Sequence, residues 1–201
     1  MALFIGIIPF SILLWKKRAL NIKEAVIPFI WITALATLYE FFGTELLHIN
    51  STYWFQLYTI LEIGCLFYYF HHILKQWHQK LLYFTLALVL TGYVISCFFW
   101  STESNLVPLA INACSISLFV FIFACLHFNM LMKRETDLWK QPNFYFTAGF
   151  AIYYACTLLL FLLSTELYKT EHRIDPWLIN ILAGIILRTL LITGTWKMKA
   201  A

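Results

Sequence analysis

Two charged residues interrupt long apolar runs of this sequence, and they are its most informative chemical feature. Glu62 stands within TILEIGCLFYYF, and Arg188 stands within LINILAGIILRTLLITGTW. A charge at the centre of a bilayer costs about 2.5–3.5 kcal/mol on insertion scales, so charged side chains in membrane segments usually pair or line a polar cavity. We therefore predict that Glu62 and Arg188 form an ion pair inside the protein.

A third charged residue, Glu40, lies in another apolar segment and adds a second acid to this group. Two acids and one base leave one charge over, and an excess carboxylate can take up a proton, bind a cation or meet a cationic ligand. The alternative is purely structural. A buried Glu–Arg pair can fix the register of two helices, while Thr, Ser and Asn side chains hydrogen-bond between helices for about 0.6 kcal/mol each.

Polar residues at helical spacing extend this group into a candidate site. Residues three and four apart lie on one face of a helix. Tyr58 and Glu62 share one such face, and Asn180 and Arg188 share another. We expect a pocket that opens outward and binds a small polar ligand, an ion or a proton. Its predicted residues are Glu40, Tyr58, Glu62, Asn112, Tyr154, Asn180 and Arg188.

The composition places these residues in a membrane protein. Apolar residues make up 62% of the sequence and charged residues only 12%, which excludes an ordinary soluble domain. A helix of about 20 apolar residues crosses the hydrocarbon core, where the backbone must satisfy its own hydrogen bonds. The sequence predicts one all-α transmembrane domain, residues 1–201, with seven spans at about 1–15, 25–47, 51–74, 80–100, 105–131, 142–164 and 176–197.

The distribution of cations predicts the orientation of the chain. Eleven of the 14 Lys and Arg residues lie in or beside the first, third and fifth joints and the C-terminal tail, whereas the alternate joints hold only Lys169 and Arg173. Because cytoplasmic loops carry the excess of Lys and Arg, we expect the N-terminus outside and the C-terminus in the cytoplasm. The net charge of +4 does not indicate nucleic acid as a partner, because these cations sit where the topology needs them.

An internal similarity bears on the architecture. Residues 28–39, PFIWITALATLY, align without gaps to residues 142–153, PNFYFTAGFAIY, and share Pro, Thr, Ala and Tyr at matching positions. Both segments open a span that runs outward, which is compatible with a three-plus-one-plus-three layout in which the fourth span links two parallel repeats. The alternative is a chance match between apolar segments rich in Phe, Ala and Tyr.

Recognised catalytic and metal-binding motifs do not accompany the charged residues. The sequence has no Gly-x-Ser-x-Gly, phosphate-binding loop or aspartyl pair, so hydrolase or kinase chemistry has no support. Glu62, Cys65 and His72 have tolerable helical spacing for a metal, but no His-x-x-x-His, His-x-x-Glu-His or Cys-x-x-Cys pattern occurs. We expect no enzymatic activity, no catalytic residues, no metal and no cofactor.

Three segments, YTILEIGCLFYYF, QPNFYFTAGFAIYYA and INILAGIILRTLLI, resemble small seven-helix bacterial membrane proteins of unassigned function. The resemblance lies in an acid within an aromatic third helix, a Pro-aromatic start to the sixth and an Asn-Ile-Leu start to the seventh. It implies a bacterial inner membrane and a role beside signalling proteins. The three-plus-one-plus-three layout is also similar to sugar transporters of the PQ-loop type, although the order here is Gln141-Pro142.

Two main classes of function are open on these observations. The first is a sensory or signalling subunit, whose helix movements another membrane or cytoplasmic signalling protein reads at the basic cytoplasmic joints. The second is a small-solute or ion transporter or channel that uses the same charged pocket, with two repeats that rock about the charged pair. The resemblance favours the first class and the internal repeat favours the second. A structural or assembly role is a third alternative.

Overall fold

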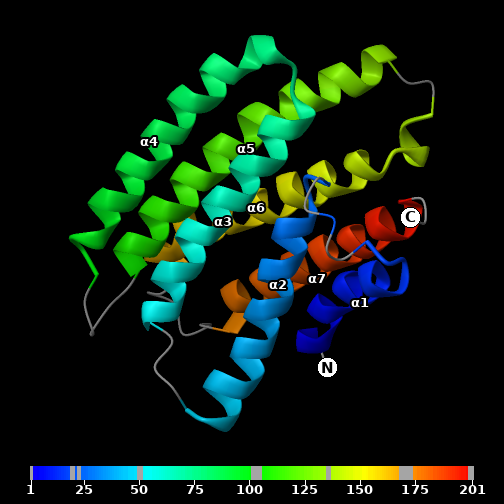
Figure 1. Ribbon diagram of the computed structural model, residues 1–201. Helices are drawn as coiled ribbons and strands as arrows, with labels where there is room; N and C mark the ends of the chain where they lie inside the picture. Colours follow the sequence, from blue (N-terminus) through cyan, green and yellow to red (C-terminus); the bar gives the residue numbers. More distant parts are fainter. Residues whose placement is uncertain are drawn as a thin grey trace.

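The computed structural model describes residues 2–18, 21, 24–48, 52–100, 106–134, 137–167 and 174–198. These residues form seven α-helices and no strand, which confirms the all-α class for this part of the chain. Figure 1 shows how the helices are arranged. The helices are α1 (Ile8–Trp15), α2 (Ile27–Tyr39), α3 (Thr52–Ile73), α4 (Gln79–Cys97), α5 (Leu106–Arg134), α6 (Pro142–Leu167) and α7 (Ile174–Lys197). Short helical segments join or extend them: η1 (Ala2–Ile7), η2 (Glu40–Leu46), η3 (Gln76–His78) and η4 (Leu138–Lys140).

The helices differ in how well they suit a bilayer. Within the described residues, four are long and apolar enough to cross a membrane: Gln76–Cys97, Val107–Lys133, Pro142–Leu162 and Leu178–Lys197. Two shorter apolar helices cover Ile5–Trp15 and Ile27–Gly43. Although α3 has 22 residues, it is not among the four, because Glu62 and several His, Gln and Tyr residues interrupt its apolar sequence. The polar residues that mark α3 as a candidate site therefore also lower its hydropathy.

The tightest packing joins α6 to α7, and α6 also packs against α5. Gly194 on α7 permits this approach, because a Cβ atom there would lie 2.3 Å from Cε1 of the buried Phe146 ring on α6. The core consists largely of buried aromatic rings. Phe29 of α2 meets Phe150 of α6 edge to face, with ring centroids 4.6 Å apart. These contacts hold α2, α6 and α7 around a common interior, which positions the polar residues that point into it.

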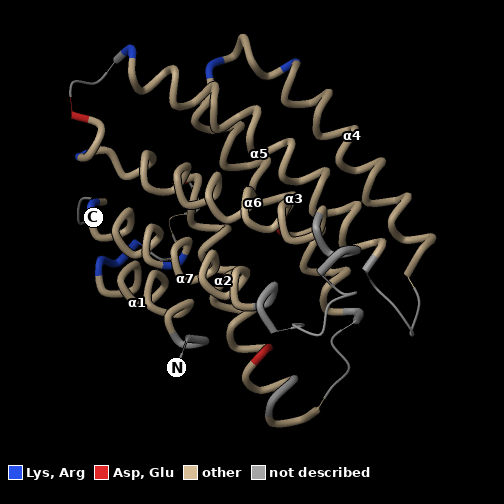
Figure 2. Tube along the Cα trace, turned by 180° about the vertical axis from the view of Figure 1, so that it is seen from behind, with Lys and Arg blue, Asp and Glu red and all other residues tan. Residues whose placement is uncertain are grey.

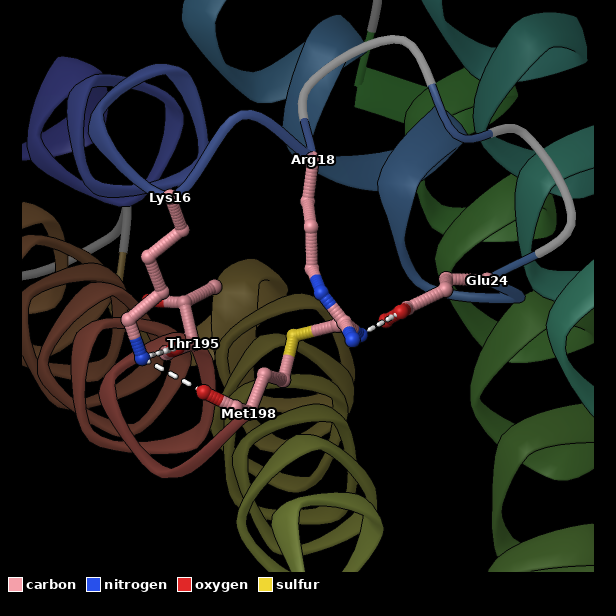
Figure 3. A network of polar contacts seen from close by, with 5 residues as sticks. All are labelled: Lys16, Arg18, Glu24, Thr195 and Met198. Carbon is pink, nitrogen blue, oxygen red and sulfur yellow. Dashed lines mark hydrogen bonds and ion pairs between the residues drawn. The ribbon is translucent and has the colours of Figure 1, made fainter. Parts of the chain in front are cut away.

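Lys16 ties the chain after α1 to the far end of α7. Its ammonium group donates to the main-chain oxygens of Thr195, Trp196 and Met198 at distances from 2.5 to 3.1 Å, as seen in part in Figure 3. The last carbonyl groups of a helix have no partner within the helix, and a lysine there satisfies them and complements the helix dipole. This contact joins segments that are 179 to 182 residues apart in the sequence.

Charges are distributed unevenly along the bundle. Figure 2 shows most described Lys and Arg residues toward one end of the helices. At this end Arg18 forms an ion pair with Glu24, and Lys140 forms one with Asp137 three residues before it. The side chains of both Arg18 and Glu24 are mostly buried, whereas those of Lys140 and Asp137 are exposed. The basic end therefore includes one sheltered ion pair, which Figure 3 shows from close by.

Candidate functional site

The predicted site residues come from four different helices and one short segment. Glu40 begins η2, Tyr58 and Glu62 lie on α3, and Tyr154 lies on α6. Arg188 and Asn180 lie on α7, and Asn112 lies on α5. The structure brings five of these seven residues within electrostatic reach of one another and adds a sixth, Tyr153, that the prediction omitted. We call this set the Glu–Tyr–Arg cluster: Glu40, Tyr58, Glu62, Tyr153, Tyr154 and Arg188.

Glu62 lies at the buried centre of this cluster. Its side chain is only 8% exposed, and the hydroxyl groups of Tyr154 and Tyr58 lie next to it. Tyr58 reaches it from one turn earlier on α3, and Tyr154 reaches it from α6. The Tyr154 hydroxyl faces the carboxyl group but falls outside hydrogen-bond geometry, so it remains a buried donor without a partner. A carboxyl group flanked by tyrosine hydroxyls can hold a proton or accept hydrogen bonds from a ligand.

Arg188 lies on the other side of the cluster, where η1, α2 and α7 meet. A Cβ atom at Gly6 would lie 2.2 Å from Oγ1 of Thr37 and 3.4 Å from Nε of Arg188, so this three-way contact requires a glycine. The charge of Arg188 acts on the carboxyl group of Glu40 at the end of α2. Arg188 thus lies near α2, which the prediction had connected to it through Glu40, and near η1, which the prediction had not.

Within the described residues, Glu62 and Arg188 do not form the predicted ion pair with each other. Other residues lie next to each of them instead. The neighbours of Arg188 on α7, Leu187 and Leu190, pack on Gly149 of α6, whereas Glu62 lies beside Tyr154. Both charges stand near the midpoints of their spans in the sequence, but the two side chains have different neighbours.

Glu40 occupies an unusual backbone setting. It is the first residue of η2, a seven-residue π-helical segment that continues α2 without a break. Wide helical turns of this kind are uncommon and occur frequently at functional sites. The Glu40 side chain is half-buried and faces the same interior as Tyr58 and Tyr153. The sequence identified Glu40 by its charge and its helical spacing, but it contained no signal for the change of helix type.

The two predicted asparagines lie on α5 and α7 and have unpaired polar atoms. Asn112 is 4% exposed, and neither its amide nitrogen nor its amide oxygen has a hydrogen-bond partner. The amide oxygen of Asn180 is also buried and unpaired. With the Tyr154 hydroxyl, these are four of the six such atoms in the described part of the chain. A buried polar group without a partner costs about 1–3 kcal/mol, so each needs an explanation such as bound water, an ion or a ligand.

A second polar group, the His127 network, was not predicted as a site. The Thr147 hydroxyl lies 2.7 Å from Nδ1 of His127 and 2.9 Å from the Tyr69 hydroxyl, which also donates to the main-chain oxygen of Asn143 at 3.2 Å. All three side chains are almost fully buried. Tyr69 follows Glu62 by two turns on the polar face of α3, so that face indicated its direction. Nothing in the sequence paired it with His127.

A polar cleft of about 350 Å³ lies at the basic end of the bundle, next to the His127 network. We call it the first cleft. The Arg18–Glu24 ion pair, His72 and Asn143 provide its polar lining, and Pro142 and Met198 are among its other residues. Polar groups therefore follow α3 from Glu62 through Tyr69 to His72, although the Glu–Tyr–Arg cluster and the His127 network share no hydrogen bond among the described residues.

Chemically, the two polar groups suit protons, small cations and small polar molecules. Within the described residues, no group of three His, Cys, Asp or Glu side chains is arranged to hold a metal ion, and this includes the spacing of Glu62, Cys65 and His72. Comparison of the chain with protein-family models, with curated proteins and with solved structures finds no match. The functional interpretation is therefore based on the chemistry and placement of the residues.

Proposed function

We propose that this protein is an integral membrane sensory or signalling subunit that binds a small polar ligand, a cation or a proton in the Glu–Tyr–Arg cluster. One observation carries the proposal. Buried polar atoms without partners concentrate on Asn112, Tyr154 and Asn180, three residues that belong to the predicted pocket. In a lipid-surrounded bundle such atoms are costly unless something polar meets them. A polar occupant beside the cluster would satisfy them.

The charges of the cluster indicate which occupants fit best. Two carboxyl groups, those of Glu40 and Glu62, accompany the single guanidinium group of Arg188. A positively charged occupant would compensate the second carboxylate, and protonation of one carboxyl group would do the same. The asparagine amides and the Tyr154 hydroxyl can both donate and accept hydrogen bonds, so they suit a small polar molecule as well. We place a cation or a proton ahead of a neutral ligand.

The proposed function includes a membrane topology with a defined orientation. All seven helices would span the inner membrane of a bacterium, with the N-terminus outside and the C-terminus in the cytoplasm. The gathering of described cations at one end of the bundle supports this orientation, because cytoplasmic ends carry the excess of Lys and Arg. The cluster then lies toward the outer half, and the first cleft opens to the cytoplasm.

A signal would pass through the helices that meet at the cluster. Arg188 contacts the region of Gly6 and Thr37, and the far end of the same helix is held by Lys16. An occupant that draws Arg188 toward or away from Glu40 would shift α7 relative to α1 and α2. Such a shift would alter the basic end, where a membrane or cytoplasmic signalling partner would read it. Only an occupant with different affinities for the two arrangements can cause this change.

The decisive variant is Asn112→Leu, tested on the purified protein in lipid nanodiscs. It removes two unpaired buried atoms and keeps a similar size, so the ligand-free protein should melt at the same or a higher temperature. The stabilisation that wild-type protein gains from Na⁺, K⁺, choline or a change of pH should be lost. Thr91→Val, at an exposed position of α4, is the control and should leave that response intact. An unaltered response in Asn112→Leu, or none in the wild type, would refute the proposed site.

Transport is the second candidate, and the His127 network favours it. The buried hydroxyl groups of Tyr69 and Thr147 and the ring of His127 continue the polar face of α3 toward the first cleft. Together with the cluster, they would place polar groups at several depths of the bundle. Liposomes containing the purified protein should then take up protons or small cations, and Glu62→Gln and Tyr69→Phe should each abolish uptake. Sustained uptake of this kind would exclude the sensor assignment, and its absence would exclude transport.

A further inference from the structure

A second cleft, separate from every residue discussed so far as a site, lies where α3, α4 and α5 end or begin. Its volume is about 450 Å³, and its lining residues are Lys75, His78, Leu126, Asn129, Met130 and Lys133. Lys75 and His78 belong to the short connection between α3 and α4, and the other four lie in the last turns of α5. The cleft is therefore built by two segments that are about 50 residues apart in the sequence.

All ionisable side chains that line the second cleft are basic. It includes two lysines, a histidine and an asparagine, all of which can donate hydrogen bonds, and it includes no carboxylate. Within the described residues, neither Lys75 nor Lys133 forms an ion pair with a carboxylate. Basic groups that converge on a cleft without counter-ions of their own attract anions. His78 is also the N-cap of α4, where the positive end of the helix dipole adds to the same field.

Apolar groups accompany the cations in this cleft. Leu126 and Met130 line it, and Trp77, directly before His78, is 92% exposed. Amphipathic tryptophans concentrate at the level of lipid headgroups. The cleft lies at the end of α5, whose 29 residues extend for about 43 Å at 1.5 Å per residue and can therefore reach beyond the hydrocarbon core into the headgroup region.

We propose that the second cleft binds the phosphate group of an anionic phospholipid, with Lys75 and Lys133 as its counter-ions and His78 and Asn129 as additional donors. Leu126 and Met130 would contact the glycerol and the upper acyl chains. The combination of basic and apolar lining favours a lipid over a free phosphate ion, which would need only the basic groups. Basic pockets between helices at the cytoplasmic side of membrane proteins commonly hold lipid headgroups. This inference is independent of what the Glu–Tyr–Arg cluster binds.

The test measures lipid binding to the full chain purified in a neutral detergent. Phosphatidylglycerol and phosphatidylcholine with identical acyl chains are titrated separately, and bound lipid is counted by native mass spectrometry. The site variant is Lys75→Gln/Lys133→Gln. The matched control is Lys80→Gln/Lys140→Gln, which removes the same net charge near the same end of the bundle but changes no residue of the cleft. Inorganic phosphate at equal and at hundredfold concentration serves as a competitor, and circular dichroism verifies that both variants are folded.

We expect wild-type protein to prefer phosphatidylglycerol, and the site variant to bind it roughly 30-fold more weakly, as two lysines at a membrane surface imply. The control should lose less than about threefold, and raised salt should weaken wild-type binding. Equal losses in both variants would show that only bulk charge matters and would overturn the proposal. Equal binding of the two lipids, or displacement by inorganic phosphate at equal concentration, would overturn it too. The single changes Lys75→Gln and Lys133→Gln provide the same test if the double variant is unfolded.

Discussion

Replacing Gly194 by alanine should destabilise the protein, because this glycine allows α6 and α7 to approach each other. The added Cβ atom would lie 2.3, 2.7 and 2.8 Å from three carbon atoms of the Phe146 ring, well inside van der Waals contact. Phe146 is 1% exposed and lies within the main core, so a shift of its ring would disturb the packing around it. Overpacking of this kind costs about 1–3 kcal/mol.

The higher helix propensity of alanine stabilises the variant and offsets part of the overpacking cost. Alanine is favoured over glycine by about 1 kcal/mol in a helix interior, so the net loss at Gly194 should be up to about 2 kcal/mol. Gly184 lies on the same helix, and a Cβ atom there would meet nothing within 4 Å. Gly184→Ala should therefore stabilise the protein by up to about 1 kcal/mol, and it is the matched control.

The assay is reversible unfolding of purified protein in mixed micelles by a denaturing detergent, followed by circular dichroism. The two variants should differ by about 1–3 kcal/mol in the free energy of unfolding, with Gly194→Ala the less stable. A third variant, Gly194→Ala with Phe146→Leu, removes the ring carbons that the methyl group meets and should recover part of the loss. If Gly194→Ala proves as stable as Gly184→Ala, then α6 and α7 do not pack as described here.

Three further changes test other contacts of the fold. Lys16→Met should lower the free energy of unfolding by about 1–3 kcal/mol, because a charged donor to three carbonyl groups is lost, and limited proteolysis should cut near the end of α7 sooner than in wild type. Thr147→Val should cost about 1–3 kcal/mol in the same unfolding assay, because it leaves Nδ1 of the buried His127 without its partner and removes one of the two contacts of the Tyr69 hydroxyl, whereas Thr147→Ser should stay near wild type. Gly6→Ala should lower the melting temperature, since its Cβ atom meets Thr37, and Gly64→Ala, with open space around it, should not. Equal melting temperatures for these two alanine variants would contradict the contact of η1 with α2.

The helices were predictable from the sequence because their signal is local. Apolar runs bounded by Lys, Asn, Glu and Pro predicted helical segments that coincide with the described helices to within a few residues. Helical spacing also predicted which face of each helix is polar. Tyr58 and Glu62, which it placed on one face of α3, lie next to each other in the structure. Whether all seven helices span a membrane, and in which direction, remains a prediction from hydropathy and charge.

The convergence of the candidate residues depended partly on spacing and partly on packing. Periodicity predicted that Glu40, Tyr58, Glu62, Tyr154 and Arg188 face inward, and the structure places them within electrostatic reach of one another. Their role in binding a ligand remains a prediction. Spacing within one helix contains no information about which helix lies opposite, so the partners of each residue were beyond a prediction from sequence.

Local sequence therefore determined the helical class, the apolar boundaries and the inward direction of the charged side chains, because these depend on residues three or four positions apart. Only the tertiary structure determined which residues on different helices contact one another. The packing of the helices places Glu62 beside tyrosines and Arg188 near Gly6 and Thr37. The pairing of His127 with Thr147 and the meeting of Lys75 with the end of α5 likewise depend on how separate helices slide against one another. That sliding is set by the sum of many weak side-chain contacts across helices, and no single segment of the sequence encodes it.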